Sequence, residues 1–364
     1  ATYVAEDGLI KTAASGVPRI DFLDSSEGSL KLESQRTNLI TYSEDFSQWL
    51  PYQINTPLPN QGTSPDGNNN ATKIFVTINR AKSVVYKSAS GLGNITRSVF
   101  AKKGSADYMF FDVPSSNAGV WFNLSNGEVG TINSGTATIE DYGNGWYRCS
   151  CTANWSLDTF AIGLSDADNS TALTANKDIL IWGAQSEIAS YPTSYIKTEG
   201  ATATRVADSC IQTVPDGIIG QTEGTIYFES TINGLQGGDM RFQLSDGSTN
   251  NWFFLNSGEA TGIGVKARAY INNGNVNQFN SYSDYLSEGT HKYALAYSLN
   301  DIAFYVDGIQ IALDTSATIP SCSKINLSGN VPTNASTQNL LEYSQVKLYN
   351  TRLSNSELAE LTTL

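Results

Sequence analysis

The sequence predicts an all-β fold: two tandem antiparallel β-sandwiches followed by a short C-terminal helix. The first observation is length, because 364 residues are roughly two to three times the ~150 residues of an average domain. The second is composition. Gly, Tyr and Phe are abundant and only 16% of residues are charged, against about 25% in ordinary soluble domains. The third is that short β-branched or aromatic runs alternate with turn residues along the chain, as they do in sandwiches.

The expected strands of the first half are separated by Asn- and Gly-rich turns, and they include residues 82–87, 98–102, 108–113 and 120–124. Those of the second half include residues 224–232, 265–271, 291–297 and 302–306. Asp307-Gly308 follows the last of these runs and predicts a hairpin turn. Ser354 precedes residues 355–361 with Glu357 at the third position, a capping box that predicts a short helix.

A change in pattern near residues 190–215 marks a domain boundary. Pro192 breaks the strand pattern, and the small, polar residues 197–204 are typical of a linker. We therefore expect four parts, namely a lead segment at 1–37, a first sandwich at 38–190, a linker at 191–212 and a second sandwich at 213–364.

Charge and composition exclude several classes of function. The 22 Lys and Arg against 35 Asp and Glu give a net charge of −13, which opposes binding to nucleic acid and anionic lipid. The single His rules out a multi-histidine metal centre. No apolar run approaches the ~20 residues of a membrane span. Residues 1–4 lack the features of a signal peptide, which leaves open a removed signal, a start inside a longer chain or release without export.

The four cysteines do not form a zinc motif, because no further ligands follow at a suitable spacing. Cys149 and Cys151 lie two apart in a strand-like run and so share one face, where we expect buried free thiols. Cys210 and Cys322 are either free or joined in a disulfide that closes most of the second half.

Several motifs, taken in order, resemble bacteriophage tail, fibre and head-spike proteins. They are LKLESQRTNL at 30–39, YSEDFSQW at 42–49, SVFAKK at 98–103, NGWYRC at 144–149, IWGAQSE at 181–187 and SYPTSYI at 190–196. The resemblance covers about residues 1–210 and implies a jelly roll like that of carbohydrate-binding modules. From about residue 213 the chain resembles concanavalin- or laminin-G-type lectin sandwiches, through GTIYF at 224–228, FYVDG at 304–308 and VKLYNTRL at 346–353.

The sequence offers little for catalysis, and we expect no catalytic residues. Glycoside hydrolysis needs two facing carboxylates, and the Glu-x-Asp-x-x-Glu strand of concanavalin-type hydrolases is absent. His291, at the start of an expected strand, is interpreted as a surface residue or one with its hydrogen bonds satisfied.

The resemblance implies a structural calcium near the opening motif of the first sandwich, because similar modules hold one there. Glu44 or Asp45 would then ligate the ion together with Glu187, since calcium prefers oxygen ligands. The alternative is that Asp45 only caps the turn at Phe46.

Sugar binding requires exposed aromatic faces and hydrogen-bonding side chains. Trp49, Trp121, Trp155 and Trp252 stand beside polar or turn residues and are the candidates, with core packing as the alternative for each. Trp146 and Trp182, inside the resemblance motifs, are expected in the core. Trp252 is the leading candidate, with Asn251 as a partner for a sugar hydroxyl, and residues 281–285 offer a second, loop-borne surface.

Three functions remain open at this point. The first, which we favour, is a non-catalytic phage virion protein, a fibre, spike or capsid decoration, that adheres to host or environmental polysaccharides from the virion surface. The second is a purely structural virion component that binds other virion proteins. The third is the carbohydrate-binding region of a secreted polysaccharide-degrading enzyme. A homo-oligomer is expected, because weak single sugar sites gain from multivalency.

Overall fold

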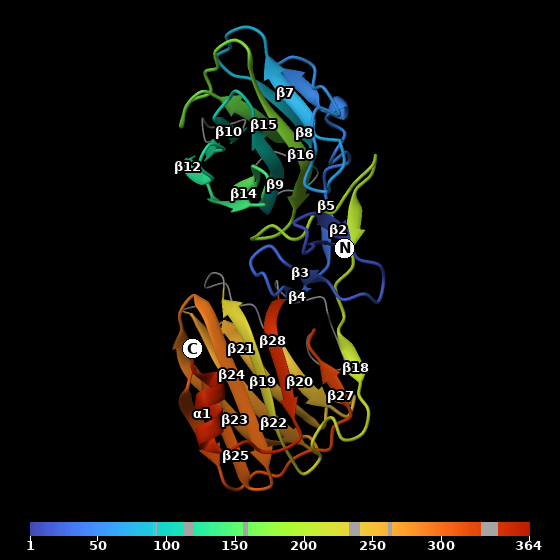
Figure 1. Ribbon diagram of the computed structural model, residues 1–364, viewed down its shortest axis with the longest axis vertical. Coiled ribbons are helices and arrows are strands. Elements are labelled where there is room, and N and C mark those ends of the chain that lie inside the picture. The colour runs from blue at the N-terminus through green and yellow to red at the C-terminus, as the bar shows by residue number, and fades with distance from the viewer. Residues whose placement is uncertain are drawn as a thin grey trace. The chain divides into compact units, whose positions relative to one another are not determined.

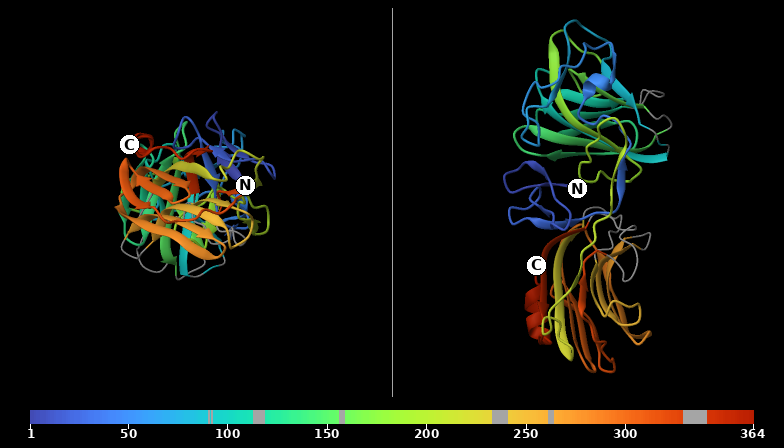
Figure 2. Two further views of the ribbon diagram at one scale, coloured as in Figure 1. Left: turned by 90° about the horizontal axis from the view of Figure 1, so that it is seen from below. Right: turned by 90° about the vertical axis from the view of Figure 1, so that its right-hand side faces the viewer.

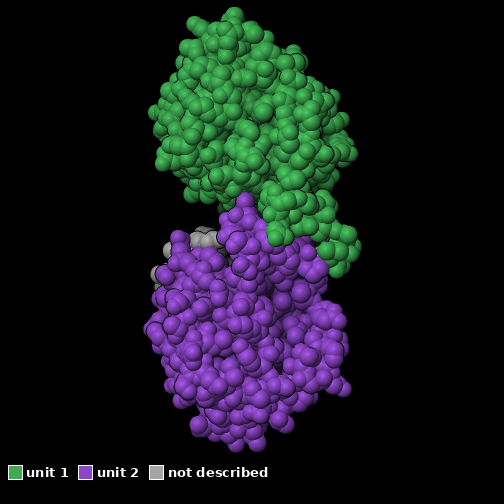
Figure 3. Space-filling model, in the orientation of Figure 1, with its two compact units in different colours: residues 1–17, 36–205 green, residues 18–35, 206–364 purple. Residues whose placement is uncertain are grey.

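The computed structural model describes residues 1–89, 91, 93–112, 119–155, 159–232, 241–260, 264–328 and 341–364. It is built almost wholly of antiparallel strands (Figure 1) and confirms the predicted all-β class. The chain divides into two compact units, coloured separately in Figure 3: unit 1 comprises residues 1–17 and 36–205, and unit 2 comprises residues 18–35 and 206–364.

Unit 1 is a sandwich of two antiparallel sheets. The six-stranded sheet runs in the order β12 (Glu128–Ile132), β11 (Val120–Asn123), β10 (Tyr108–Asp112), β15 (Thr159–Ser165), β8 (Val84–Ser88), β6 (Leu50–Tyr52). The five-stranded sheet runs β13 (Thr136–Asp141), β14 (Trp146–Trp155), β9 (Gly93–Lys103), β16 (Lys177–Glu187), β7 (Thr72–Val76). Two small pairs join β1 (Thr2–Val4) to β2 (Ile10–Thr12) and β17 (Ala203–Arg205) to β5 (Arg36–Asn38), and a short 3-10 helix, η1, spans Phe46–Gln48.

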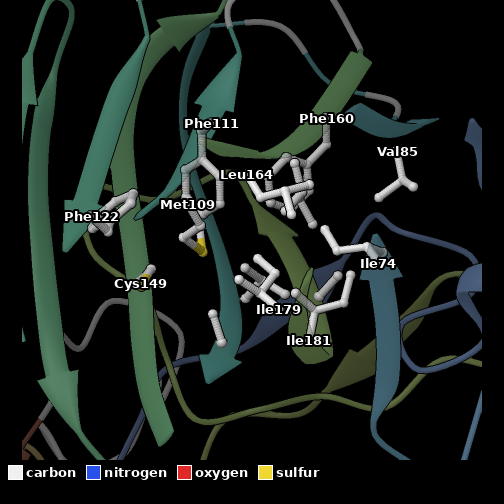
Figure 4. Close-up of a cluster of buried hydrophobic side chains, with 14 of the residues drawn as sticks. Ile74, Val85, Met109, Phe111, Phe122, Cys149, Phe160, Leu164, Ile179 and Ile181 are labelled. Atoms are coloured by element: carbon white, nitrogen blue, oxygen red, sulfur yellow. The ribbon is translucent and has the colours of Figure 1, made fainter. Parts of the chain in front are cut away.

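The core of unit 1 lies between these two sheets. Alternate side chains of a strand point to the same face, and the apolar ones of each sheet point toward the other sheet. Figure 4 shows the side chains meeting there, which include Ile74, Val85, Met109, Phe111, Phe122, Cys149, Phe160, Leu164, Ile179 and Ile181. Cys149 and Cys151 both belong to this core, as their spacing predicted. All four cysteines are free thiols in the structure, including Cys210 and Cys322. Burial raises the pKa of Cys149 well above its usual value and that of Cys151 to about 12.

Unit 2 is a second sandwich, again with two antiparallel sheets. One runs β18 (Ile211–Thr213), β27 (Lys324–Asn326), β20 (Arg241–Ser245), β21 (Trp252–Ala260), β22 (Val265–Asn273), β23 (Val276–Leu286). The other runs β26 (Ile309–Asp314), β25 (Asp301–Val306), β24 (Gly289–Ser298), β19 (Glu223–Ile232), β28 (Leu341–Tyr349), β4 (Ser29–Leu32), β3 (Ile20–Asp21). The predicted hairpin is present, with Asp307 and Gly308 at φ of 50° and 79° between β25 and β26.

The C-terminal helix α1 (Asn355–Thr362) begins where the capping box predicted. The Ser354 side chain accepts from the Glu357 amide at 3.3 Å, and the Glu357 carboxylate accepts from the Ser354 amide at 2.7 Å. Within the part of the chain that the structure describes, no helix is long and apolar enough to cross a membrane.

The domain limits differ from the expected ones at both ends of unit 1. Residues 18–35, expected in the lead segment, belong to unit 2, because β4 extends its seven-stranded sheet by pairing with β28. Residues 191–205, expected in the linker, belong to unit 1, where Tyr195 is buried and β17 pairs with β5. Both differences arise from strand pairs between residues far apart in sequence.

Candidate functional site

Two of the four candidate tryptophans, Trp49 and Trp121, are buried in unit 1. Trp49 packs on Phe46 and Phe160, with ring centroids 5.0 and 5.8 Å away, and belongs to the sandwich core. Trp121 stacks on Phe110 at 5.8 Å and donates from its indole nitrogen to the Ser170 carbonyl at 2.7 Å. Neither ring is open to a ligand, so the core alternative holds for both.

The other three tryptophans of unit 1 are Trp146, Trp155 and Trp182. Trp155 ends β14, where its backbone pairs with Gly93, and its side chain lies outside the described residues. Trp146 and Trp182 are buried, as expected from their place in the motifs.

Trp252 has a different position, at the start of β21 in unit 2. Its neighbour Phe253 points into the core of the sandwich, so the Trp252 ring lies on the opposite face of the sheet, where it is half-buried. There it stacks on Tyr270 of β22, with ring centroids 4.6 Å apart and planes inclined by 16°. The leading candidate of the sequence is therefore on an outer sheet face.

Asn251, expected to bind a sugar hydroxyl, instead joins two turns of unit 2. Its amide nitrogen donates to the Asp246 carboxylate at 2.8 Å, and its amide oxygen accepts from the Gly274 amide at 2.8 Å. Both ends of the side chain are thus engaged within the protein. Asn251 positions the loop that leads into Trp252, and its binding of a sugar hydroxyl stays a prediction.

The strand next to β21 supplies two cations to the same outer face. Residues 265–271 alternate between buried and half-buried, so Ala267 and Ala269 face the core while Lys266, Arg268 and Tyr270 face outward. This alternation is visible in the sequence and predicted the strand, but it does not tell which side chains the outward residues meet. The adjacency of Tyr270 to Trp252 depends on the pairing of β21 with β22, which no local pattern reveals.

Each cation lies against tyrosine rings. The Arg268 guanidinium is 5.0 Å from the centroid of Tyr270 and 4.9 Å from that of Tyr282. The Lys266 ammonium is 4.5 Å from the centroid of Tyr285. Such cation–π contacts contribute about 0.5–1 kcal/mol at exposed sites, and they hold the rings in defined orientations.

Tyr282 and Tyr285 correct the prediction of a loop at residues 281–285, because this segment lies within β23. Three positions apart, the two rings would face opposite sides of a regular strand. The register between β22 and β23 shifts between Lys266 and Arg268, which is a β-bulge or similar irregularity. Both rings consequently face the cations of β22, and they are 40% and 50% exposed.

We call the surface formed by Trp252, Tyr270, Arg268, Tyr282, Lys266 and Tyr285 the β21–β23 face. The outer face of the other sheet of unit 2 is different, because α1 packs on it (Figure 2, right). There Leu358 covers Tyr227, Tyr305 and small alanines. The six residues that define the β21–β23 face instead remain exposed or half-buried, while Phe254, on the same side of β21, is buried.

The carboxylates expected to bind calcium do not share a centre. Asp45 caps η1 by accepting from the Ser47 amide at 3.1 Å, which is the alternative role considered for it. Glu187 is buried and accepts from the Thr193 amide at 3.0 Å and from the Thr193 hydroxyl. Both are thus engaged by protein donors.

Glu44 lies in a separate cluster. It accepts from the Tyr195 hydroxyl at 2.9 Å and faces the Lys197 ammonium at 3.3 Å, and burial raises its pKa. Among the described residues, no three His, Cys, Asp or Glu side chains form a group that could hold a metal. A calcium ion at Glu44, Asp45 and Glu187 stays a prediction without structural support.

Oxygen atoms suited to a hard cation do converge beside Glu44, in the loop at residues 64–70. The buried Ser64 hydroxyl lies 2.5 Å from the Asp66 carboxylate and 3.0 Å from the Asn68 carbonyl, and it also contacts the Asn70 amide oxygen. The Asn70 amide nitrogen donates to Glu44 at 3.3 Å. Calcium prefers such ligands, and sequence reasoning did not consider this loop.

His291 is engaged at both ring nitrogens. Nδ1 lies 2.6 Å from the Asp307 carboxylate, and Nε2 lies 2.9 Å from the Ser287 carbonyl. This arrangement matches the interpretation of His291 as a residue with satisfied hydrogen bonds.

No protein-family model matches the sequence, and no curated protein matches it. Among solved structures, the chain is similar to the CBM40 of the Ruminococcus gnavus IT-sialidase, with 17% identity over 39% of this chain and 83% of that chain, at a TM-score of 0.31. It is similar to domain 4 of AbnA, a GH43 arabinanase from Geobacillus stearothermophilus in complex with arabinotriose (13% identity, 42% and 71% covered, TM-score 0.32). It is also similar to domains LG4-5 of the mouse laminin α1 chain (12% identity, 94% and 96% covered, TM-score 0.27). At these scores, no conclusion on function follows.

Proposed function

We propose that this protein is a non-catalytic glycan-binding protein and that the β21–β23 face of unit 2 is its contact surface. The observation that carries the proposal is the set of four aromatic rings on one outer sheet face, with Arg268 and Lys266 between them. Two of the rings, Tyr282 and Tyr285, are 40% and 50% exposed.

The chemistry of this surface suits a sugar. Aromatic rings have an electron-rich face, which complements the weakly positive C–H face of a pyranose. Hydroxyl groups need hydrogen-bond partners close to that platform. The guanidinium of Arg268 lies beside Tyr270, and its Nε donates to the exposed Asn280 at 3.0 Å. Asn280 therefore presents an oriented amide next to the rings.

The biological setting that we propose is the surface of a phage virion, with host or environmental polysaccharide and other virion proteins as partners. Support comes from the ordered motifs of residues 1–210 that resemble phage tail and spike proteins. We further propose a homo-oligomer, since several weak sites on one particle increase avidity. The carbohydrate-binding region of a secreted polysaccharide-degrading enzyme is an equally plausible setting for the same surface. Mass spectrometry of purified virions separates the two settings.

The first test is binding of the purified protein to a panel of bacterial surface and algal polysaccharides. We expect saturable binding to one glycan class. Trp252→Ala and Tyr270→Ala should each weaken it about tenfold, the equivalent of about 1.4 kcal/mol, with the circular dichroism spectrum unchanged. Tyr52→Ala is the matched control, because Tyr52 is a 49% exposed tyrosine of unit 1. Repeating the assay with a chelator tests the predicted calcium.

Absence of binding to every polysaccharide, with a folded protein, would contradict the proposed function and favour a purely structural virion component. Equal losses for Tyr52→Ala and Trp252→Ala would contradict the location of the site.

A further inference from the structure

The rings of the β21–β23 face are spread along the strands instead of surrounding one point. Trp252 lies opposite Asn272 of β22, and Tyr285 lies opposite Lys266 of the same strand. At about 3.3 Å per residue, the path along β22 between these two levels is about 20 Å. This distance exceeds the width of a single sugar ring severalfold.

The intermediate positions along this path are also occupied. Tyr270 follows Trp252 in direct stacking contact, and the Arg268 guanidinium then lies between the rings of Tyr270 and Tyr282. Lys266 and Tyr285 form the last step. Tyr270 contacts both the Trp252 ring and the Arg268 guanidinium and so supports the row. The more exposed rings of Tyr282 and Tyr285 offer stacking platforms beside the two cations.

The rings and cations hold one another, so little side-chain order remains to be imposed by a ligand. Contacts of about 0.5–1 kcal/mol each favour one orientation of each ring before binding, which reduces the entropy lost on association. A row of preoriented platforms complements a repeating chain, because each sugar unit presents the same C–H face and the same hydroxyl groups in turn.

Building on the proposed function, we propose that the β21–β23 face binds an internal segment of a linear polysaccharide, several sugar units long, and does not select a terminal monosaccharide. The rings at the two ends, Trp252 and Tyr285, contact different sugar units of one chain. A chain bound along this row continues beyond the contacted units at both of its own ends.

The test uses oligosaccharides, from the monosaccharide to the hexasaccharide, made by partial hydrolysis of the panel polysaccharide that binds. Isothermal titration calorimetry should give an affinity that rises with length and then levels off. Trp252→Ala and Tyr285→Ala should each weaken hexasaccharide binding about three- to tenfold. The control Lys347→Ala removes a lysine that lies 5.3 Å from the Tyr227 ring in the other sheet of unit 2, and it should have no effect.

Several results would overturn this inference while leaving the proposed function intact. A monosaccharide that binds as tightly as the hexasaccharide would do so, as would sensitivity at one end of the path only. If Trp252→Ala changed the oligomeric state in sedimentation but not the sugar affinity, the face would instead be an interface between copies of this chain. Failure of every panel polysaccharide to bind would remove the proposed function itself.

Discussion

His291 illustrates at the residue scale how a lone titratable group is used structurally. Both ring nitrogens face acceptors, the Asp307 carboxylate at 2.6 Å and the Ser287 carbonyl at 2.9 Å. Only the imidazolium form has two N–H groups to donate to both. The hydrogen bond to Asp307 accordingly raises the pKa of His291 above its usual value.

This geometry predicts a pH dependence of stability. Because the folded-state pKa is raised, the contribution of His291 is complete below its unfolded pKa of about 6.5 and is lost as pH rises through the folded pKa. The free energy of unfolding, measured by urea titration in steps from about pH 6 upward, should fall in the wild type. His291→Gln should lack this fall, and no other histidine titrates, because the sequence has one. If the free energy of unfolding changed with pH in the same way in the wild type and in His291→Gln, the stabilising role of protonated His291 would be contradicted.

The tryptophans show how far the sequence around a single residue predicts whether that residue can bind a ligand. Polar neighbours made Trp49, Trp121 and Trp252 look alike, yet the first two are buried. Their burial depends on which strands and loops pack over them, and the residues adjacent in sequence do not reveal this packing. Trp146 and Trp182 were placed correctly because they lie inside longer motifs.

At the scale of elements, residues 18–35 are the part of unit 2 that lies between the two segments of unit 1 in sequence. Arg19 contacts Glu33 at 2.6 Å and also Asp208, and it is buried, as is Glu33. A second buried pair joins Lys31 to Asp21 at 3.1 Å. These ion pairs accompany the pairing of β4 with β28.

Arg19→Met should therefore destabilise unit 2. Removing one partner of a buried ion pair costs about 3–5 kcal/mol, and here the buried Glu33 carboxylate loses its Arg19 contact at 2.6 Å. Trp252 is the one tryptophan of residues 206–364, so the fluorescence transition that disappears in a Trp252→Phe background reports the unfolding of unit 2 in denaturant. Lys11→Met is the control, because the Lys11–Asp7 pair is on the surface of unit 1 and its loss should barely change stability. Similar unfolding midpoints for the two variants would show that the Arg19 cluster does not hold this segment.

Local patterns predicted the elements far better than their partners. The alternation of residues 265–271, the Asp307-Gly308 turn and the capping box at Ser354 each report on a few adjacent residues, and each element is present. The place of residues 18–35 depends on contacts with residues 208 and 341–343, which no adjacent pattern encodes.

At the scale of the whole molecule, the proposed function assigns sugar contact to one sheet face of unit 2. Three strands contribute side chains to that face. The strand β21 brings Trp252, β22 brings the cations and Tyr270, and β23 brings the exposed tyrosines. The sequence named Trp252 and the segment 281–285, while the register that joins them through β22 came only from the structure.

The most direct test of this account is hydroxyl-radical footprinting with and without the bound oligosaccharide, because the label modifies accessible aromatic side chains. We predict that saturation with the ligand reduces labelling of Trp252, Tyr282 and Tyr285, while Tyr52 of unit 1, which is 49% exposed, labels as before. Unchanged labelling of the three β21–β23 residues in a saturated complex, with protection in unit 1 instead, would contradict it.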